Sequence, residues 1–221
     1  MTTPRKRIAV LISGRGSNME ALIEACRAPD FPGEIVLVLS NRPDAGGLET
    51  ARRAGILTLA LDHRAYANRT AHEDAVAAAL DEAAPDVVCL AGYMRLLGAP
   101  FVERYAGRMI NIHPSLLPLF PGLHTHERAL AAGMRLHGCT VHYVTAGMDE
   151  GPIIAQAAIP VHAGDDAQSL SARLLTAEHR LYPHALRLVL SGRVRWQDGA
   201  AVPAATDGTP GGAGDMLISP A

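Results

Sequence analysis

The sequence is poor in cysteine and in aromatic residues, and both shortages exclude classes of protein. Its three cysteines, Cys26, Cys89 and Cys139, are widely spaced within apolar segments. An odd number at such spacing argues against a disulfide framework and a zinc site, and indicates buried thiols in a reducing compartment. Phe, Trp and Tyr make up only 4% of the chain, which favours aliphatic helices packed on a sheet over a β-sandwich.

Long hydrophobic runs and a strong net charge are also absent. The basic segment Arg5–Arg7 is followed by an apolar run that ends at Ser13, too soon for the hydrophobic region of a signal peptide. No segment approaches membrane-spanning length. The formal net charge of −2 gives no general attraction to nucleic acid or to a membrane surface. We therefore expect a cytoplasmic protein that binds neither.

At 221 residues the chain can bury one large core, and its hydrophobic pattern predicts how that core is built. In the first half, short apolar runs alternate with segments of helical periodicity. The predicted strands are Ile8–Ile12, Ile35–Leu39, Leu57–Leu61 and Val87–Ala91, and the predicted helices are Asn18–Cys26, Gly47–Ala54 and Ala71–Ala84. Apolar strands joined by helices are typical of parallel βαβ units. We predict a single α/β domain with a doubly wound, mostly parallel sheet.

The second half continues with the same kinds of element. Further helices are expected at Ala99–Tyr105, His126–Ala132 and Ala167–Leu190, and further strands at Arg108–His113, Thr140–Val144 and Ile153–Val161. From Gly199 onward the chain is rich in Gly, Pro, Ala and Thr and has little apolar surface to bury. We interpret this end as a loose tail.

A glycine-rich turn, Ser13-Gly14-Arg15-Gly16-Ser17-Asn18, joins the first predicted strand to the first helix. Glycine lets the backbone approach a ligand, and the free N–H groups of a helix N-terminus attract an anion. Met19 stands where a dinucleotide fingerprint needs its third glycine, and no acid ends the second strand, which disfavours NAD. The turn predicts either a cradle for one phosphate, with Arg15 beside it, or a tight turn without a ligand. Ser17 and Glu20 have the spacing of a capping box.

The most informative segment is Asn111-Ile112-His113-Pro114, at the end of a predicted strand. Alternation sends Asn111 and His113 to the same face, and Pro114 ends the strand by removing a hydrogen-bond donor. An amide N–H beside an imidazole can stabilise an oxygen on which negative charge develops. The alternative is a core histidine next to a strand-end cap. Asp149, on a glycine-rich turn, could orient the imidazole and keep it protonated, or could be a turn residue only.

Histidines are dense in the middle of the chain, at His113, His124, His126, His137 and His142. They form no His-x-x-x-His pair and have no acidic or cysteine partner at ligand spacing, so the pattern disfavours a metal site. Ser115 lacks the glycine-flanked elbow of a serine hydrolase, and Cys139 fits strand packing better than nucleophilic catalysis.

Six motifs follow one another along the chain. They are Ser13-Gly-x-Gly-Ser-Asn18, Leu90-Ala-Gly-Tyr-Met-Arg-Leu-Leu97, Asn111-Ile-His-Pro-Ser-Leu-Leu-Pro118, Pro121-Gly-Leu-His-Thr-His126, Gly138-x-Thr-Val-His142 and Asp149-x-Gly-Pro-Ile153. Together they resemble the phosphoribosylglycinamide formyltransferases, from about Ile8 to Arg193. The resemblance implies a Rossmann-like formyltransferase fold and an enzyme of purine synthesis. Such an enzyme transfers the formyl group of 10-formyltetrahydrofolate to the amine of 5-phosphoribosylglycinamide, needs no metal, and is a monomer or homodimer.

The resemblance also implies a role for each matching residue. Asn111, His113 and Asp149 match the catalytic trio. The ribonucleotide side is implied for Arg15, Gly16, Ser17, Asn18 and Glu178. The folate side is implied for Arg64, Met94, Arg95, Leu96, Leu97, Asn111, Thr145, Ala146, Gly147, Met148 and Asp149. Because the Asp62–Asn68 region is one residue shorter than in the family, either His63 or Arg64 could take the folate-side role.

The same resemblance divides the chain into functional parts. We expect a formyltransferase domain over residues 1–193, with a half that binds the nucleotide phosphate at about 7–100 and a half for folate and catalysis at about 101–193. Residues 194–221 are expected to form a flexible C-terminal extension.

The nearest alternative functions are formyl transfer to methionyl-tRNA and hydrolysis, in which water is the formyl acceptor. The tRNA enzymes are expected to carry a basic Arg-Gly segment after Pro118, where this chain has Leu119–His124, and a basic RNA-binding domain that we do not expect after Arg193. The hydrolases carry a regulatory domain in front of the sheet, which we also do not expect here. A module that senses a nucleotide without changing it is the non-enzymatic alternative.

Overall fold

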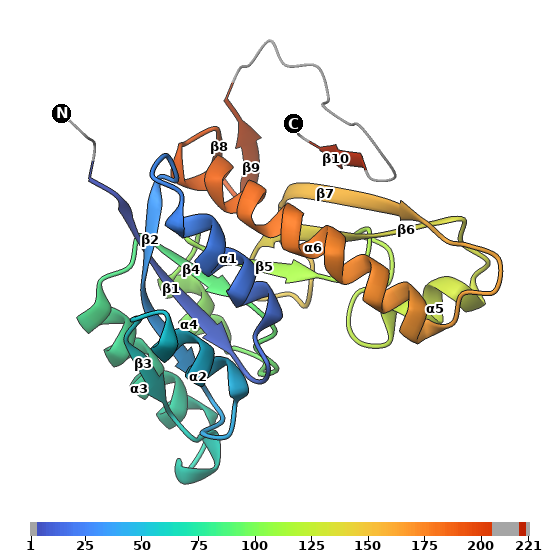
Figure 1. Ribbon diagram of the computed structural model, residues 1–221. Helices are drawn as coiled ribbons and strands as arrows, with labels where there is room; N and C mark the ends of the chain where they lie inside the picture. The colour runs from blue at the N-terminus through green and yellow to red at the C-terminus, as the bar shows by residue number, and fades with distance from the viewer. Residues whose placement is uncertain (1–3, 205–216, 220–221) are drawn as a thin grey trace. The chain divides into compact units, whose positions relative to one another are not determined.

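The computed structural model describes residues 4–204 and 217–219. The chain forms two compact units, Met1–Ile110 and Asn111–Ala221, whose elements are labelled in Figure 1. None of the helices in the described ranges combines the length and the apolar character that crossing a lipid bilayer requires.

The first unit is built on four parallel strands. They are β1 (Lys6–Ile12), β2 (Gly33–Ser40), β3 (Thr58–Ala60) and β4 (Val87–Leu90), in the order β4-β1-β2-β3. Strand β1 pairs in parallel with both β2 and β4, and β2 pairs in parallel with β3. Ile8–Ile12 are completely buried, as expected for a central strand covered on both faces. All four strands were predicted from their apolar runs.

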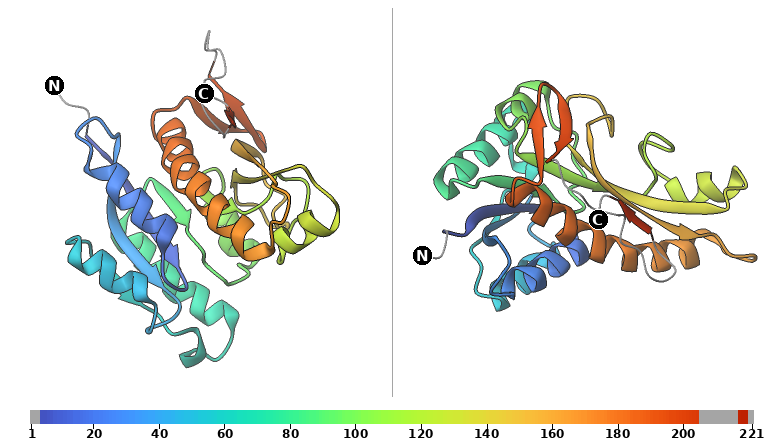
Figure 2. Two further views of the ribbon diagram at one scale, coloured as in Figure 1. Left: turned by 45° about the vertical axis from the view of Figure 1, so that its right-hand side comes forward. Right: turned by 90° about the horizontal axis from the view of Figure 1, so that it is seen from above.

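Helices cover both faces of this sheet. They are α1 (Ser17–Arg27), α2 (Gly46–Arg53), α3 (Arg69–Ala83) and α4 (Ala99–Arg104), with a 3₁₀ turn η1 at His63–Ala65. After β3 the chain returns past β1 to form β4, so the direction of strand addition reverses. Right-handed crossovers then place α3 on the face opposite α1 and α2, as Figure 2 shows. The doubly wound α/β architecture is confirmed for this unit.

Strand β5 (Met109–His113) leads the chain into the second unit, where the strand order is β5-β6-β7-β10. Strands β6 (Leu136–Tyr143) and β7 (Ile153–Pro160) pair antiparallel, and β10 (Leu217–Ser219) pairs antiparallel with β7. The register of β6 on β7 shifts between Val141 and His142. Such a bulge bends the strand and changes the direction of the side chain beside it.

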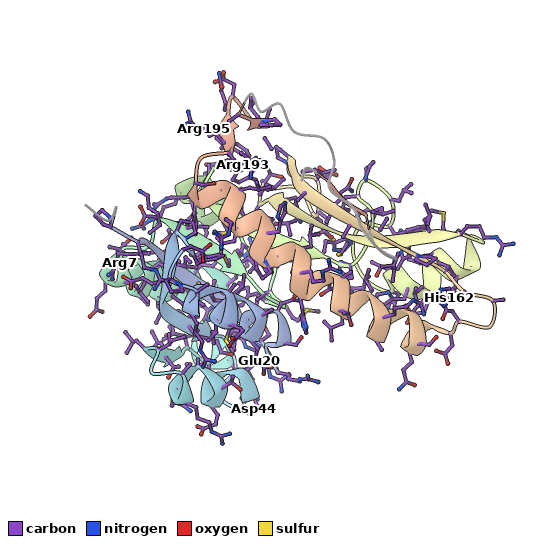
Figure 3. The ribbon with its side chains drawn as sticks, turned by 45° about the horizontal axis from the view of Figure 1, so that its top comes forward. Arg7, Glu20, Asp44, His162, Arg193 and Arg195 are labelled. Atoms are coloured by element: carbon purple, nitrogen blue, oxygen red, sulfur yellow. The ribbon has the colours of Figure 1, made fainter. Side chains whose placement is uncertain are left out.

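Two helices complete the second unit. The short helix α5 (Thr125–Ala131) precedes β6, and the long helix α6 (Ala167–Leu190) packs on β6 and β7. Helix α6 begins with a true capping box, because the Asp166 carboxylate accepts from Ser169 N and the Ser169 hydroxyl accepts from Asp166 N. Charged and polar side chains such as Asp44, His162 and Arg195 are exposed, as Figure 3 shows.

The capping box predicted for the first helix is wrong. Helix α1 has Gly16 as its N-cap, in the left-handed conformation with φ of 77°, and no side chain caps it. A glycine reaches this conformation without the steric cost that serine would have. The capping position therefore falls one residue before Ser17, and the Ser17–Glu20 spacing has no capping function.

The C-terminal extension is also less irregular than predicted. Strands β8 (Val194–Gln197) and β9 (Ala200–Pro203) form an antiparallel hairpin where we expected a flexible segment. Val194 is buried, and the Trp196 ring meets the Tyr143 ring edge-on with centroids 5.3 Å apart. A buried anchor and an aromatic contact hold the hairpin on the second unit. The rest of the predicted tail, apart from β10, lies outside the described residues.

Candidate active site

His113 lies between two hydrogen-bond acceptors at the end of β5. Its Nδ1 is 3.3 Å from Asp149 Oδ2, and its Nε2 is 3.0 Å from the Phe120 carbonyl oxygen. The carbonyl accepts a hydrogen bond from the protonated Nε2, and the carboxylate forms an ion pair with the ring when Nδ1 also carries a proton. His113 is buried. The geometry therefore fits an imidazolium held by a carboxylate in a site with little access to water.

Asp149 is held in place by the backbone around it. Its φ of 56° is left-handed, a conformation that aspartate tolerates better than most residues, and its Oδ2 accepts a hydrogen bond from Gly122 N at 2.8 Å. A side chain at Gly151 would collide with the Tyr143 carbonyl oxygen, 1.6 Å from the position of its Cβ. Glycine is thus required at residue 151 for the turn that brings Asp149 to His113.

Asn111 is oriented by His142, a residue for which the sequence predicted no role in the site. Asn111 Nδ2 lies 3.3 Å from His142 Nε2, and His142 Nδ1 lies 3.0 Å from the Tyr143 carbonyl oxygen. The carbonyl requires a proton on Nδ1, which leaves Nε2 of a neutral ring to accept from the amide. Burial lowers the pKa of His142, which agrees with a neutral ring. The second amide N–H of Asn111 remains available to a substrate oxygen.

His142 also lies near the carboxylate, with Nε2 3.8 Å from Asp149 Oδ1. The structure thus brings the predicted trio, Asn111, His113 and Asp149, together around one further imidazole. The sequence signals for His142 were its place in a histidine-rich stretch and at the end of the motif Gly138-x-Thr-Val-His142, and neither assigned it a role. The bulge at this position of β6, which depends on pairing with β7, could not be found from the sequence.

In the first unit, the glycine-rich turn leads from β1 into α1. Because the N-cap of α1 is a glycine, no side chain at that position accepts a hydrogen bond from the first turn of the helix. Gly47 N donates to the Gly14 carbonyl, and a Cβ at Gly47 would lie 2.6 Å from Ile12 Cδ1. Arg15 is exposed and forms no ion pair with any described residue. This arrangement suits an anion such as a phosphate.

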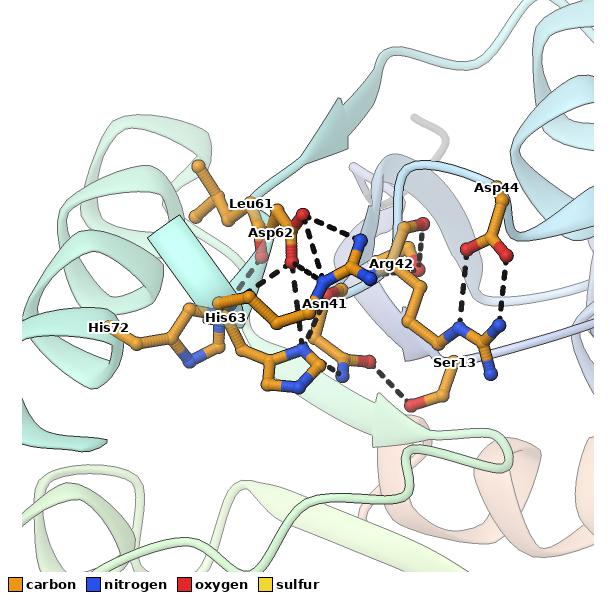
Figure 4. Close-up of polar contacts among 10 residues, drawn as sticks. Ser13, Asn41, Arg42, Asp44, Leu61, Asp62, His63 and His72 are labelled. Carbon is orange, nitrogen blue, oxygen red and sulfur yellow. Dashed lines mark hydrogen bonds and ion pairs between the residues drawn. The ribbon is translucent and has the colours of Figure 1, made fainter. Parts of the chain in front are cut away.

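The segment Met94–Leu97 follows β4 and borders a cavity of about 430 Å³, also in the first unit. The cavity is lined by Ser13, Gly14, Asn41, Arg42, His63, Gly92, Met94 and Arg95. Its wall is tied together by polar contacts that can be followed in Figure 4. Ser13 Oγ accepts from Met94 N at 2.7 Å and donates to Asn41 Oδ1 at 2.5 Å, while Asn41 Nδ2 lies 3.2 Å from His63 Nδ1.

The same cavity bears on the choice between His63 and Arg64. His63 lines it, whereas the Arg64 guanidinium forms hydrogen bonds with both carboxylate oxygens of Asp62 and is largely exposed. This pairing lowers the pKa of Asp62 to about 2. Half-buried Arg95 forms no ion pair with a described residue. The structure therefore places His63 and Arg95, rather than Arg64, at the cavity.

Taken along the whole chain, these features match a known family. The family model described as formyl transferase matches residues 6–186, a range that runs through both compact units. The chain belongs to the formyl transferase family. The resemblance to formyltransferases found in the sequence is thus confirmed over residues 6–186.

Relatives and solved structures agree with the family match. This formyl transferase is 49% identical over 194 residues to phosphoribosylglycinamide formyltransferase of Escherichia coli, covering 88% of this chain and 92% of the relative. It is 50% identical over 193 residues, 87% of this chain, to the trifunctional purine biosynthetic protein adenosine-3 of Bos taurus. The chain spans only 19% of that trifunctional protein's length.

The fold is shared with solved structures of the same name. The crystal structure of phosphoribosylglycinamide formyltransferase from Brucella melitensis is similar to this formyl transferase with a TM-score of 0.83 and 61% identity. The likeness covers 86% of this chain and 97% of that one. The α/β fold with a mostly parallel sheet, predicted from the sequence, is thus confirmed for the formyl transferase domain.

The remaining predicted residues lie in the second unit. Glu178 is buried in α6, close enough to Cys139 that its charge adds to burial in raising the pKa of that thiol. Thr145–Met148 lie in the turn between β6 and β7, just before Asp149, and Met148 is exposed. Among the described residues, no three His, Cys, Asp or Glu side chains are grouped in a way that could hold a metal ion.

Proposed function

We propose that this formyl transferase moves the formyl group of 10-formyltetrahydrofolate to the amine of 5-phosphoribosylglycinamide. The observation that carries the proposal is the position of His113 between the Asp149 carboxylate and the Phe120 carbonyl, with Asn111 oriented beside it. Both donors are neutral or cationic N–H groups, which is what a developing oxyanion requires. The Escherichia coli and Brucella melitensis relatives, whose names state this activity, support the choice of substrates.

The reaction proceeds by direct attack. The amine nitrogen attacks the formyl carbon, and the carbonyl π electrons move to the oxygen, which becomes a tetrahedral oxyanion. The free amide N–H of Asn111 and the His113 imidazolium stabilise that oxygen. As the intermediate collapses, the bond from carbon to the folate nitrogen breaks, and the Nε2–H of His113 leaves the Phe120 carbonyl to supply the proton that this nitrogen takes up. Asp149 accepts the amine proton through water and passes it by the same route to His113, which restores the protonation of both residues. A positioned amine needs neither a metal nor a covalent enzyme intermediate.

The predicted binding residues for each substrate come from both units. The glycine-rich turn at Arg15–Asn18 holds the ribonucleotide phosphate, and buried Glu178 contacts the ribosylglycinamide. Met94–Leu97, the Thr145–Met148 turn and His63 hold the folate, with Arg95 available to a carboxylate. The protein acts in the cytoplasm on small molecules, as a monomer or homodimer and without nucleic acid.

The test is a formyl-transfer assay with three acceptors. We expect purified protein to convert 10-formyltetrahydrofolate to tetrahydrofolate only when 5-phosphoribosylglycinamide is present. Turnover with water alone, or with methionyl-tRNA in place of the ribonucleotide, would assign the protein to another activity of the family. Binding of both substrates without turnover would support the sensing module instead.

A further inference from the structure

The loop Phe120–His124 touches both ionisable members of the catalytic trio. The Phe120 carbonyl accepts from His113 Nε2 at 3.0 Å, and Gly122 N donates to Asp149 Oδ2 at 2.8 Å. A shift of the loop would therefore remove a partner from the imidazole and from the carboxylate at the same time.

The loop is held in a conformation that its own residues do not favour. Phe120 and His124 have positive φ values, 55° and 57°, and so does Gly122 at 79°. A left-handed conformation costs roughly 1–2 kcal/mol for each residue that has a Cβ. Strain of this kind persists only where surrounding contacts enforce it. Some group outside the loop must therefore hold it.

Arg128, in helix α5, makes such contacts. Its Nη1 donates to the Pro121 carbonyl at 2.5 Å and lies 3.4 Å from the Leu123 carbonyl oxygen. Its guanidinium carbon lies 5.4 Å from the centroid of the Phe120 ring, within cation–π range. One planar guanidinium thus contacts three of the five loop residues.

The charge of Arg128 is not used in an ion pair with any described residue. The neighbouring Glu127 instead lies 3.6 Å from His124, at the end of the same loop. The contacts of Arg128 are therefore those of a group that shapes a loop, since the partners are two backbone carbonyls and one aromatic face.

We propose that Arg128 is a positioning residue for formyl transfer. It holds the Phe120–His124 loop so that the Phe120 carbonyl and the Gly122 N–H fix His113 and Asp149 in their reactive orientations. Arg128 acts through the loop and does not bind substrate. This inference rests on the proposed function, since that function gives His113 and Asp149 their catalytic roles.

The test compares Arg128→Gln and Arg128→Lys with Arg135→Gln. Arg135 is an exposed arginine beyond the end of α5 whose side chain forms no hydrogen bond or ion pair with a described residue, so it serves as the matched control. We expect Arg128→Gln to lower kcat roughly 10- to 100-fold, since misplacement by about 1 Å can cost about 100-fold, while both KM values stay within about twofold. Arg128→Lys should be intermediate, because an ammonium keeps the charge but lacks the planar fork. Arg135→Gln should match the wild type.

A raised KM at unchanged kcat in Arg128→Gln would show that Arg128 binds a substrate. Unchanged kcat and KM values would show that the contacts of Arg128 with the loop do not affect catalysis. Either result overturns the proposal. Should Arg128→Gln fail to fold, Phe120→Leu removes the ring beneath the guanidinium while keeping the carbonyl, and should lower kcat by a smaller factor. An unchanged kcat in that variant would also count against the proposal.

A second readout does not require activity. The NMR signal of the His113 Nε2–H, which reports its hydrogen bond to Phe120, should shift in Arg128→Gln and not in Arg135→Gln. An unshifted signal overturns the proposal even if the wild type transfers no formyl group. Wild-type inactivity with a shifted signal would instead refute the proposed function and leave the positioning contact in place.

Discussion

In the first unit several candidate anion-binding groups have no ionic or capping partner among the described residues, whereas in the second unit the candidate catalytic groups are held by an ion pair and by hydrogen bonds to neighbouring groups. Helix α1 has no side-chain cap, and Arg15 and Arg95 form no ion pair with a described residue. By contrast, His113 has an acceptor at each ring nitrogen, and Asn111 is oriented by His142.

This difference indicates two ways of using polar groups. Donors without partners are suited to recognising an anion, since the ligand supplies the missing acceptor. Donors already fixed by neighbours are suited to stabilising a transition state, because no reorganisation is needed when charge develops. Substitutions in the two units should therefore affect different kinetic constants.

Asn111→Ala should produce the largest effect. Removing one oxyanion donor lowers kcat by roughly 100- to 1,000-fold, and both KM values should change little because the charge appears only during attack. Steady-state kinetics measure the split. The isosteric Asn111→Asp serves as the matched variant: it keeps the shape but removes the donor, so it should be at least as slow. Near-normal kcat in Asn111→Ala would place the oxyanion site elsewhere.

The buried imidazoles of the second unit should make its stability sensitive to acid. Burial, with a smaller contribution from His126 and His113, lowers the pKa of His137 to about 4. Between pH 6.5 and 4 the unfolded chain binds a proton that the folded ring does not, so the free energy of unfolding falls as the pH falls, by up to about 3 kcal/mol for this group. Lowered pKa values of His126 and His142 act in the same direction.

Chemical denaturation at several pH values checks this expectation. His137→Gln should lose less stability than the wild type between pH 6.5 and 4. His162→Gln, at an exposed position labelled in Figure 3, should lose as much as the wild type. An identical pH dependence in His137→Gln and wild type would contradict a neutral buried ring at this position.

Gly16→Val should have a smaller effect, and on the other kinetic constant. The left-handed φ and the nearby Met19 Cε, 3.2 Å from the position of a Cβ, force the turn to move. A strain of about 1–2 kcal/mol corresponds to a KM for the ribonucleotide raised roughly tenfold, with the folate KM and kcat nearly unchanged. Gly46→Val is the matched control, because its Cβ would meet no atom within 4 Å and its φ is not left-handed. An equal rise of the KM values for the ribonucleotide and for the folate in Gly16→Val would show that the turn has only a structural role.

Local sequence features predicted many of the strands and several of the site residues in both units. Buried apolar runs located β1 and β2, and strand alternation followed by Pro114 located the Asn111 and His113 pair. The glycine-rich turn was predicted as a phosphate cradle, but its capping was misassigned because the left-handed Gly16 takes the N-cap position.

The features that sequence missed depend on contacts between distant residues. The hairpin of β8 and β9 is anchored by the contact between the Trp196 and Tyr143 rings, and no local sequence pattern predicts this contact. The role of His142 depends on a bulge in β6 and on the Asn111 amide, which lies on another strand. Likewise, the cavity wall that includes His63 forms only when the ends of β1 and β2 lie together.

The most direct test of the account is the protonation of His113. In ¹⁵N NMR spectra at neutral pH, both ring nitrogens of wild-type His113 should show the signature of protonated nitrogen, because each faces an acceptor. Asp149→Asn keeps the shape and removes the negative partner, so the ring should lose a proton and kcat should fall while both substrates still bind. A neutral His113 ring in the wild type, or an unchanged ring in Asp149→Asn beside a large loss of rate, would contradict the account.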